Sequence, residues 1–283
     1  MAEDAMDVRK ASPASAAADR TGPVQGGGAR GAIERYVAVG DSFTEGVGDP
    51  GPDGTLLGWA DRLAVLLAEQ RPAGTLRYAN LAVRGRLLDQ IVAEQVPRAV
   101  ELAPDLVTFC AGGNDILRPG SDPDDVAARY EAAVVRLREA VGTVVVCTGF
   151  DTRGVPVLRH LRGKIATYTA HVRAIADRHD CLVLDLWSLR SVQDRRAWSA
   201  DRLHLSGDGH TRVALRAGQV LGLEVPADPD QPWPPEEQRS AAASRRETVM
   251  WAREHLVPWI GRRLRGESSG DGVEPKRPEL LPL

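Results

Sequence analysis

The sequence has few cysteines, few aromatic residues and no long hydrophobic run. Only three of its 283 residues are cysteines, and 5% are aromatic. Cys110, Cys147 and Cys181 each lie in or beside an apolar run, so this odd number indicates buried free thiols in a reducing compartment, not a disulfide framework. No apolar run approaches the roughly 20 residues that a membrane-spanning helix needs. These scarcities argue against a small disulfide-stabilised secreted domain and against an integral membrane protein.

An excess of charge of one sign is also absent. The formal net charge is -3 at pH 7, which gives no electrostatic reason to expect nucleic acid as a partner. The first residues contain no apolar segment of the kind found in signal peptides. We therefore expect a cytoplasmic protein that does not bind nucleic acid.

Composition divides the chain into five segments. Residues 1–33 are rich in Ala, Ser and Gly and cannot bury enough apolar surface to offset chain entropy, so we expect a disordered tail. Residues 34–223 have the composition of a folded domain. The rest is expected to form a Pro-rich linker at 224–244, an amphipathic helix at 245–266 and a second disordered tail at 267–283.

The expected domain alternates β-branched runs with helical periodicity. Mostly continuous apolar runs predict strands that are buried on both faces of a parallel sheet, at residues 36–39, 76–82, 106–110, 143–147 and 182–187. Apolar residues spaced three and four apart predict helices between and after them, at 58–70, 87–102, 124–141, 162–179 and 208–222. This order predicts one α/β domain with helices on both faces of a five-stranded parallel sheet.

A glycine-rich stretch at residues 46–51 matches the G-x-G-x-x-G pattern of dinucleotide-binding loops. That pattern requires a helix that opens directly from the glycines and meets the pyrophosphate. Here the glycines continue into Pro50, Pro52 and Gly54, and a second match at 26–31 precedes the first strand. Both are interpreted as chance matches, and no cofactor is expected.

The first predicted strand ends in Gly40-Asp41-Ser42, which makes Ser42 a candidate nucleophile. Ligands of parallel α/β sheets bind outside the carboxyl ends of the strands, where Ser42 is expected to lie with Asp41 bracing its turn. A nucleophilic serine needs a base and an orienting acid. Asp201 precedes His204 by three residues, so its carboxylate can accept the Nδ1 proton and leave Nε2 free. The alternatives are a turn cap for Asp201 and an ordinary loop histidine for His204.

Gly85 and Asn114 are candidate donors to a developing oxyanion. Each follows a predicted strand, so a backbone N–H of Gly85 and the side-chain amide of Asn114 could join the N–H of Ser42 at one rim of the sheet. The alternative is that both residues serve ordinary turns.

His210 offers a competing interpretation of the same region. Together with Asp201, His204 and Asp208 it could form a metal cluster. We favour a site without metal.

Four blocks, GDSFTEG, NLAVRG, GGND and DRLH, follow one another in an order that resembles the SGNH (GDSL-type) hydrolases. The resemblance covers the whole α/β domain and implies a flavodoxin-like three-layer α/β/α sandwich. It implies that Ser42 is the nucleophile, with Asp201 and His204 as its partners. It further implies an oxyanion hole formed by the Ser42 N–H, Gly85 and Asn114.

Two further positions, one beside Gly85 and one after His204, also bear on this resemblance. The family usually has a small or hydroxyl residue where this chain has Arg84, which is expected to place a cation beside the pocket. A Gly-His pair that opens a helix is common in the family, so the resemblance implies a structural role for His210.

These observations predict a GDSL-type serine esterase or lipase that cleaves a small-molecule carboxylic ester. An acyltransferase with the same triad and a catalytically silent binding module are the alternatives.

The predicted helix at 245–266 carries an apolar stripe, two tryptophans and six arginines, a pattern found both in interfacial helices and in helices docked on a core. We expect docking on the hydrolase domain, without membrane association.

Overall fold

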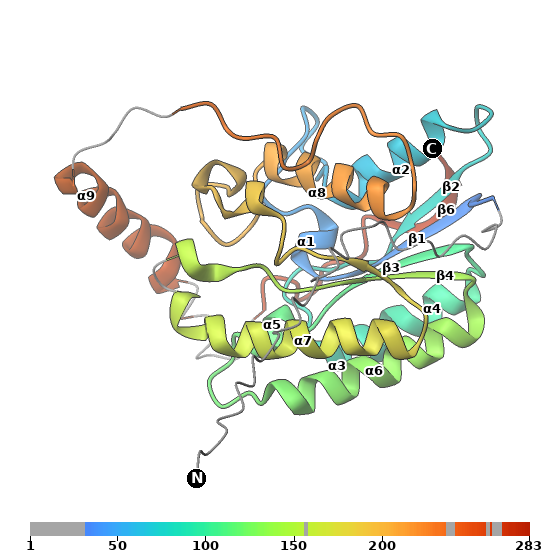
Figure 1. The fold of residues 1–283 in the computed structure, drawn as a ribbon, viewed down its shortest axis with the longest axis horizontal. Helices are drawn as coiled ribbons and strands as arrows, with labels where there is room; N and C mark the ends of the chain where they lie inside the picture. Colours follow the sequence, from blue (N-terminus) through green and yellow to red (C-terminus); the bar gives the residue numbers. More distant parts are fainter. Residues whose placement is uncertain (1–31, 156–157, 236–240, 259–260, 262–267) are drawn as a thin grey trace, which may run out of the picture. The chain divides into compact units, whose positions relative to one another are not determined.

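A six-stranded sheet forms the centre of the computed structural model, which describes residues 32–155, 158–235, 241–258, 261 and 268–283 (Figure 1). Residues 31–283 form one compact unit, and the expected tail at 1–33 lies outside the described residues except for its last two. The strand order is β5-β4-β3-β1-β2-β6. Five strands are parallel and match the five apolar runs: β1 (Arg35–Gly40), β2 (Arg77–Asn80), β3 (Leu106–Cys110), β4 (Thr143–Cys147) and β5 (Leu182–Leu184).

The sixth strand corrects the expectation of five strands and of disorder throughout residues 267–283. β6 (Arg277–Pro282) pairs antiparallel with β2, at the edge of the sheet. Its two prolines are compatible with an edge strand, where one side of the backbone needs no ladder donor. The composition of this segment resembles that of a disordered tail, and it could not reveal the strand because the strand forms on an edge supplied by a distant part of the chain.

Helices cover both faces of the sheet (Figure 1). On one face α2 (Trp59–Glu69) packs against α8 (Gly207–Val220), and on the other α6 (Pro123–Ala140) packs against α7 (Arg162–Arg178). The helix predicted at 87–102 is present as α3 (Leu88–Gln90), a π-helical turn η1 (Ile91–Gln95) and α4 (Val96–Glu101). The result is the three-layer α/β/α arrangement that the resemblance implied.

The two-faced core explains why the strands are continuously apolar. In β1, Val37 and Val39 belong to the core cluster shared with α6 and α7, whereas Tyr36 and Ala38 belong to the cluster shared with α2 and α8. All four side chains are fully buried. A strand buried on both faces has no solvent side on which polar residues could alternate.

Shorter elements and the C-terminal region complete the fold. They are α1 (Ser42–Glu45), α5 (Gly113–Ile116), the 3₁₀ turns η2 (Thr152–Gly154), η3 (Leu158–Leu161), η4 (Arg190–Gln193) and η5 (Arg195–Ala197), α9 (Ala241–Trp251) and the π-helical turn η6 (Ala252–Leu256). The expected linker at 224–244 is held on the domain in its described part, because Trp233 Nε1 donates to the carbonyl of Ser191 at 2.8 Å. The predicted helix at 245–266 begins earlier, at Ala241, and most of it beyond residue 258 lies outside the described residues. None of the helices in the described ranges is long and apolar enough to span a bilayer.

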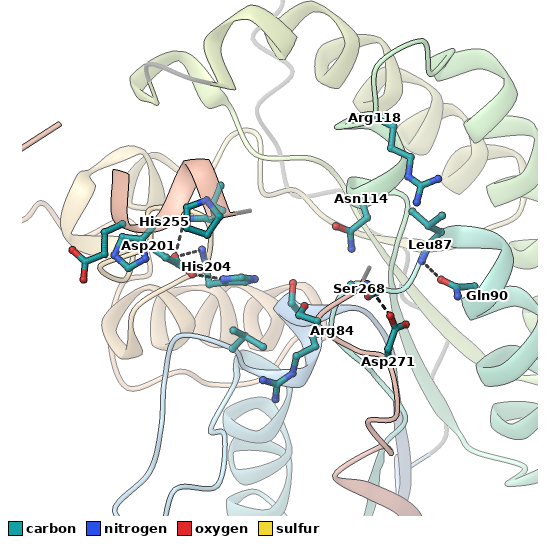
Figure 2. Close-up of a pocket in the computed structure, with 17 residues that line it drawn as sticks. Arg84, Leu87, Gln90, Asn114, Arg118, Asp201, His204, His255, Ser268 and Asp271 are labelled. Carbon is teal, nitrogen blue, oxygen red and sulfur yellow. Dashed lines mark hydrogen bonds and ion pairs between the residues drawn. The ribbon is translucent and has the colours of Figure 1, made fainter. Parts of the chain in front are cut away.

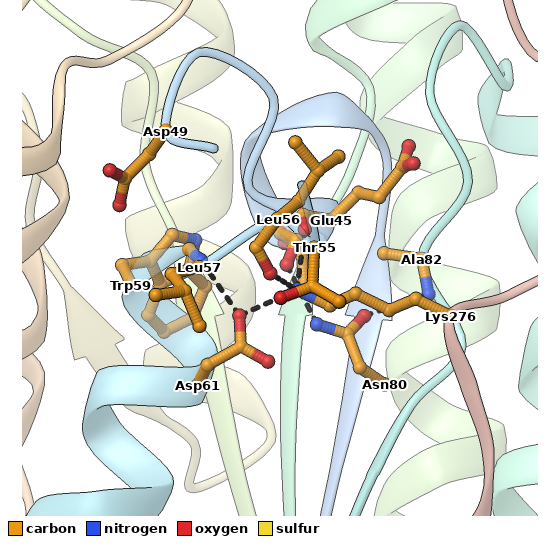
Figure 3. A network of polar contacts seen from close by, with 12 residues as sticks. Glu45, Asp49, Thr55, Leu56, Leu57, Trp59, Asp61, Asn80, Ala82 and Lys276 are labelled. Carbon is orange, nitrogen blue, oxygen red and sulfur yellow. Dashed lines mark hydrogen bonds and ion pairs between the residues drawn. The ribbon is translucent and has the colours of Figure 1, made fainter. Parts of the chain in front are cut away.

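Lys276 fastens the start of β6 to the element that carries Ser42 (Figure 3). Its Nζ lies 2.6 Å from the carbonyl oxygen of Glu45 in α1, 2.8 Å from that of Leu56 and 2.6 Å from Asp61 Oδ2. An ammonium group has three donors, and all three find acceptors here. The end of the chain is thereby tied to the loop and helix beside the candidate nucleophile.

Candidate active site

Ser42 lies where β1 gives way to α1. Gly40 ends the strand, and a Cβ on it would lie 2.5 Å from the carbonyl oxygen of Cys110, so only glycine fits this approach of two strands. Asp41 caps the helix, because its carboxylate accepts the backbone N–H of Phe43 at 3.2 Å. Ser42 is therefore the first residue of a helix, at the carboxyl edge of the sheet, and its exposed fraction is 7%.

The loop after α1, which matched the dinucleotide pattern, passes close to the segment that carries His204. Gly48 has φ +101°, and a Cβ on it would lie 2.4 Å from the carbonyl oxygen of Leu205 and 3.1 Å from the Cβ of His204. A larger residue could neither adopt this conformation easily nor fit this space. The glycines thus serve the close packing of two loops.

Asp201 and His204 form a tight pair in the turn before α8. Asp201 Oδ2 lies 2.6 Å from His204 Nδ1, and Oδ1 accepts the backbone N–H groups of Leu203 at 2.9 Å and His204 at 3.0 Å. The Ser199 hydroxyl adds a hydrogen bond of 2.7 Å to Oδ1. Burial alone would raise the pKa of Asp201, but the hydrogen bonds and the charge of His204 hold it well below its usual value. The carboxylate therefore stays ionised at neutral pH and orients the imidazole.

The two predicted oxyanion donors, Gly85 and Asn114, follow strands β2 and β3 and lie at the same edge of the sheet as Ser42. Gly85, which follows β2, has φ +74°. Asn114, in α5 after β3, has its Nδ2 atom 3.2 Å from Asp41 Oδ2 and 3.1 Å from the carbonyl oxygen of Arg86. These contacts hold the side-chain amide of Asn114 at the edge of the turn that carries Ser42.

All five predicted site residues line one cavity of about 430 Å³: Ser42, Gly85, Asn114, Asp201 and His204. Figure 2 shows Asp201 and His204 on one side of this cavity and Asn114 on the other. In the part of the chain that the structure describes, no hydrogen bond joins Ser42 to His204. Such bonds are often long without substrate and tighten in the reacting complex.

A second, smaller cavity of about 140 Å³ also reaches Ser42, Asn114 and His204. Its walls include the rings of Phe43, Phe150 and Trp198. Phe150 has its ring centre 4.9 Å from that of Phe43 and 5.2 Å from that of Trp198. The candidate nucleophile therefore lies between a polar cavity and an apolar one.

Arg84 does not present a free cation to the larger cavity. Its guanidinium Nε lies 3.0 and 3.1 Å from the two carboxylate oxygens of Glu45, and its backbone N–H donates to the same carboxylate at 2.6 Å. The Glu45 side chain is only 4% exposed. The charge expected beside the pocket is thus neutralised by a buried partner in α1.

His210 is part of the core. Its Nδ1 accepts the backbone N–H of Trp59 at 3.1 Å, and Nε2 lies 3.4 Å from the carbonyl oxygen of Val47. Burial lowers its pKa to about 3, so the imidazole is neutral at pH 7. His210 therefore ties α8 to α2, and within the described ranges no group of three or more His, Cys, Asp or Glu residues could hold a metal ion.

Sequence reasoning did not place the C-terminal extension, here residues 241–283, at this site. Six of its residues line the larger cavity: Glu254, His255, Pro258, Ser268, Ser269 and Asp271. Of the expected apolar stripe, Val249 is 58% exposed, whereas Trp251, which lies near the stripe, is only 6% exposed. The stripe was expected at Val249, Ala252, Leu256, Ile260 and Leu264, and the last three lie outside the described side chains. Trp251, one of two tryptophans beside the apolar stripe of this charged helix, was the available signal.

Comparison with known proteins identifies the relatives of this chain. The sequence profile of the GDSL-like Lipase/Acylhydrolase family matches residues 38–212. The chain is 26% identical over 212 residues to the uncharacterized protein YpmR of Bacillus subtilis, covering 66% of this chain and 81% of that protein. It is 24% identical over 214 residues to an acetylxylan esterase of Geobacillus stearothermophilus, covering 69% and 96%.

Solved structures show the same fold. The acetylxylan esterase Axe2 of Geobacillus stearothermophilus superposes with a TM-score of 0.58 at 21% identity, covering 69% of this chain and 97% of that one. Variants of Axe2 in which a serine, an aspartate or a histidine is changed to alanine are described as catalytic mutants. In that enzyme the aspartate precedes the histidine by three residues.

Proposed function

The chain belongs to the GDSL-like lipase/acylhydrolase family, and from this premise we propose that it is a serine esterase that forms an acyl-enzyme on Ser42. The observation that carries the proposal is the 2.6 Å contact between Asp201 and His204 in the cavity that Ser42 also lines. The three-residue spacing of Asp201 and His204 equals that of the aspartate and histidine altered in the Axe2 mutants.

The proposed reaction has two steps. His204 Nε2 takes the proton of the Ser42 hydroxyl as Oγ attacks the ester carbonyl, and the oxyanion is held by the N–H groups of Ser42 and Gly85 with the amide of Asn114. The C–O bond to the alcohol then breaks, and the alcohol leaves with the proton from His204. Water repeats the sequence on the acyl-enzyme and releases the acid. No cofactor or metal takes part.

The two cavities suggest how an ester would lie. The acyl group stays bonded to Ser42 while the alcohol departs, so we assign the acyl group to the small apolar cavity and the alcohol to the larger polar one. A volume of about 140 Å³ is small beside the roughly 300–1,000 Å³ of pockets that hold drug-sized ligands, so it suits a short acyl chain. The proposed substrate is therefore a short-chain ester of a polar alcohol.

The cysteines bear on where this reaction takes place. Cys110, Cys147 and Cys181 are all unpaired. Three free thiols are consistent with the cytoplasmic location that we propose.

Replacement of Ser42 tests the proposal. We expect Ser42→Ala to reduce turnover of p-nitrophenyl acetate to a residual rate. The protein should stay folded, because the small side chain of this first residue of α1 contributes little packing. Ser188→Ala, which changes an exposed serine, is the matched control and should leave turnover unchanged. Near-native turnover by Ser42→Ala would show that the nucleophile is misassigned.

The same assay separates the alternatives. Product analysis with added alcohols reports acyl transfer as new esters, whereas hydrolysis yields only the free acid. A parent protein that turns over none of a panel of short-chain esters would favour a catalytically silent binding module.

A further inference from the structure

The turn between Asp201 and His204 contains a strained residue. Arg202 has φ +54°, a left-handed conformation that residues with a side chain seldom adopt. This conformation lets the chain fold back so that the Asp201 carboxylate accepts the backbone N–H groups of Leu203 and His204. A strained turn persists only where its surroundings hold it in place.

Part of what holds this turn belongs to the C-terminal extension. Trp251, the last residue of α9, donates its Nε1–H to the backbone carbonyl of Asp201 at 2.7 Å. The guanidinium of Arg202 lies over the same indole ring, 5.2 Å from its centre. Trp251 therefore contacts two successive residues of the turn and is itself buried.

Glu247 adds an ionic contact from the preceding turn of α9. Its carboxylate accepts a hydrogen bond of 3.0 Å from the Arg202 guanidinium and also pairs with Arg195. The Arg202 side chain is 13% exposed, so this pair is better shielded from solvent than an ordinary surface pair. The extension thus holds Arg202 both by an ion pair and by a ring contact.

The extension also touches the opposite side of the cavity. A Cβ on Gly85 would lie 2.3 Å from Ser268 Oγ, and one on Gly270 would lie 1.9 Å from the carbonyl oxygen of Arg84. Residues 268–270 are therefore packed directly on the loop that carries Gly85. The family profile ends at residue 212, so these contacts come from a part of the chain beyond it.

We propose that the C-terminal extension is a working part of the active site, in which Trp251 is the positioning residue that holds the Asp201–His204 turn. This rests on the proposed function of Asp201 and His204. Glu254, His255 and Pro258, which follow Trp251, line the larger cavity, and Figure 2 shows His255 beside Asp201 and His204. The extension therefore couples the geometry of the catalytic pair to the wall that faces the alcohol.

The test uses the full-length protein with Trp251→Phe, which removes the indole N–H but keeps an aromatic ring beside Arg202. Met250→Ala is the matched control, because the neighbouring Met250 side chain is 58% exposed. Two quantities are measured at a temperature where both variants are folded: the steady-state constants on p-nitrophenyl acetate, and hydrogen exchange of the backbone amides in residues 199–205.

We expect Trp251→Phe to lower kcat by about tenfold with KM unchanged, and to speed exchange in the turn by about the same factor, as for the loss of one buried hydrogen bond. Unchanged kcat together with unchanged exchange would overturn the proposal. Faster exchange in the turn of a protein without esterase activity would support the positioning role while counting against the proposed function. If Trp251→Phe does not fold, the same two measurements on Glu247→Gln test the proposal. We again expect a lower kcat and faster amide exchange in the turn.

Discussion

At the residue scale, Asn114 contacts the turn that carries Ser42 and is also a candidate hydrogen-bond donor to the oxyanion. Its amide nitrogen contacts the Asp41 carboxylate, which caps the helix of Ser42, and the carbonyl of Arg86. The same side chain lines both cavities that meet at Ser42. Both hydrogens of the amide already have acceptors, namely the Asp41 carboxylate and the Arg86 carbonyl. To donate to an oxyanion, the amide must turn one of these hydrogens away from its present acceptor. A developing negative charge is the acceptor able to draw it away.

Replacing Asn114 should therefore affect the transition state. We expect Asn114→Ala to lower kcat by about 10²–10³-fold with little change in KM, because one oxyanion donor is lost. Steady-state kinetics on p-nitrophenyl acetate, with thermal unfolding to verify the fold, is the measurement. Ser188→Ala, the exposed-serine control used for Ser42, should change kcat little. A loss confined to KM would mean that Asn114 binds the substrate in its ground state.

The elements of the fold differ in how well the sequence predicts them. Each central strand carries its signal locally, since a run such as Thr143–Cys147 is apolar on both faces. The edge strand Arg277–Pro282 carries no such signal, because only Leu280 of its apolar residues packs against the core and its pairing depends on β2. Besides this pairing, side chains that reach across the fold hold the segment, among them Lys276.

The contribution of Lys276 can be measured. Lys276→Met should lower the free energy of unfolding by roughly 2 kcal/mol, because it leaves the two carbonyls and Asp61 without their shared donor. For a chain of this length the melting temperature should fall by about 4–8 °C, measured by calorimetry. Arg98→Met, which breaks an exposed pair with Glu101, is the control and should shift melting little. An equal, small shift in both variants would show that β6 does not depend on this contact.

At the scale of the whole molecule, the site is assembled from segments that lie far apart in the sequence. The order of the four sequence blocks allowed Ser42, Gly85, Asn114, Asp201 and His204 to be predicted, and the structure places all five around one cavity. The walls could not be predicted in this way. The contact of Trp251 with Asp201 joins residues 50 positions apart, and residues 268–271 belong to a segment whose composition resembles a disordered tail. Tertiary packing, which composition does not record, places Ser268, Ser269 and Asp271 in the wall of this cavity.

The central claim is that an acyl group passes through Ser42, and trapping it on the intact protein tests this most directly. The protein is mixed with p-nitrophenyl acetate, and the reaction is quenched in acid within the first turnovers. The mass of the intact protein is then measured by mass spectrometry, and peptide mapping locates any added group. The account predicts one added acetyl group, located on Ser42 and absent from Ser42→Ala. An acetyl group on another residue, or turnover with the same label in Ser42→Ala, would contradict it.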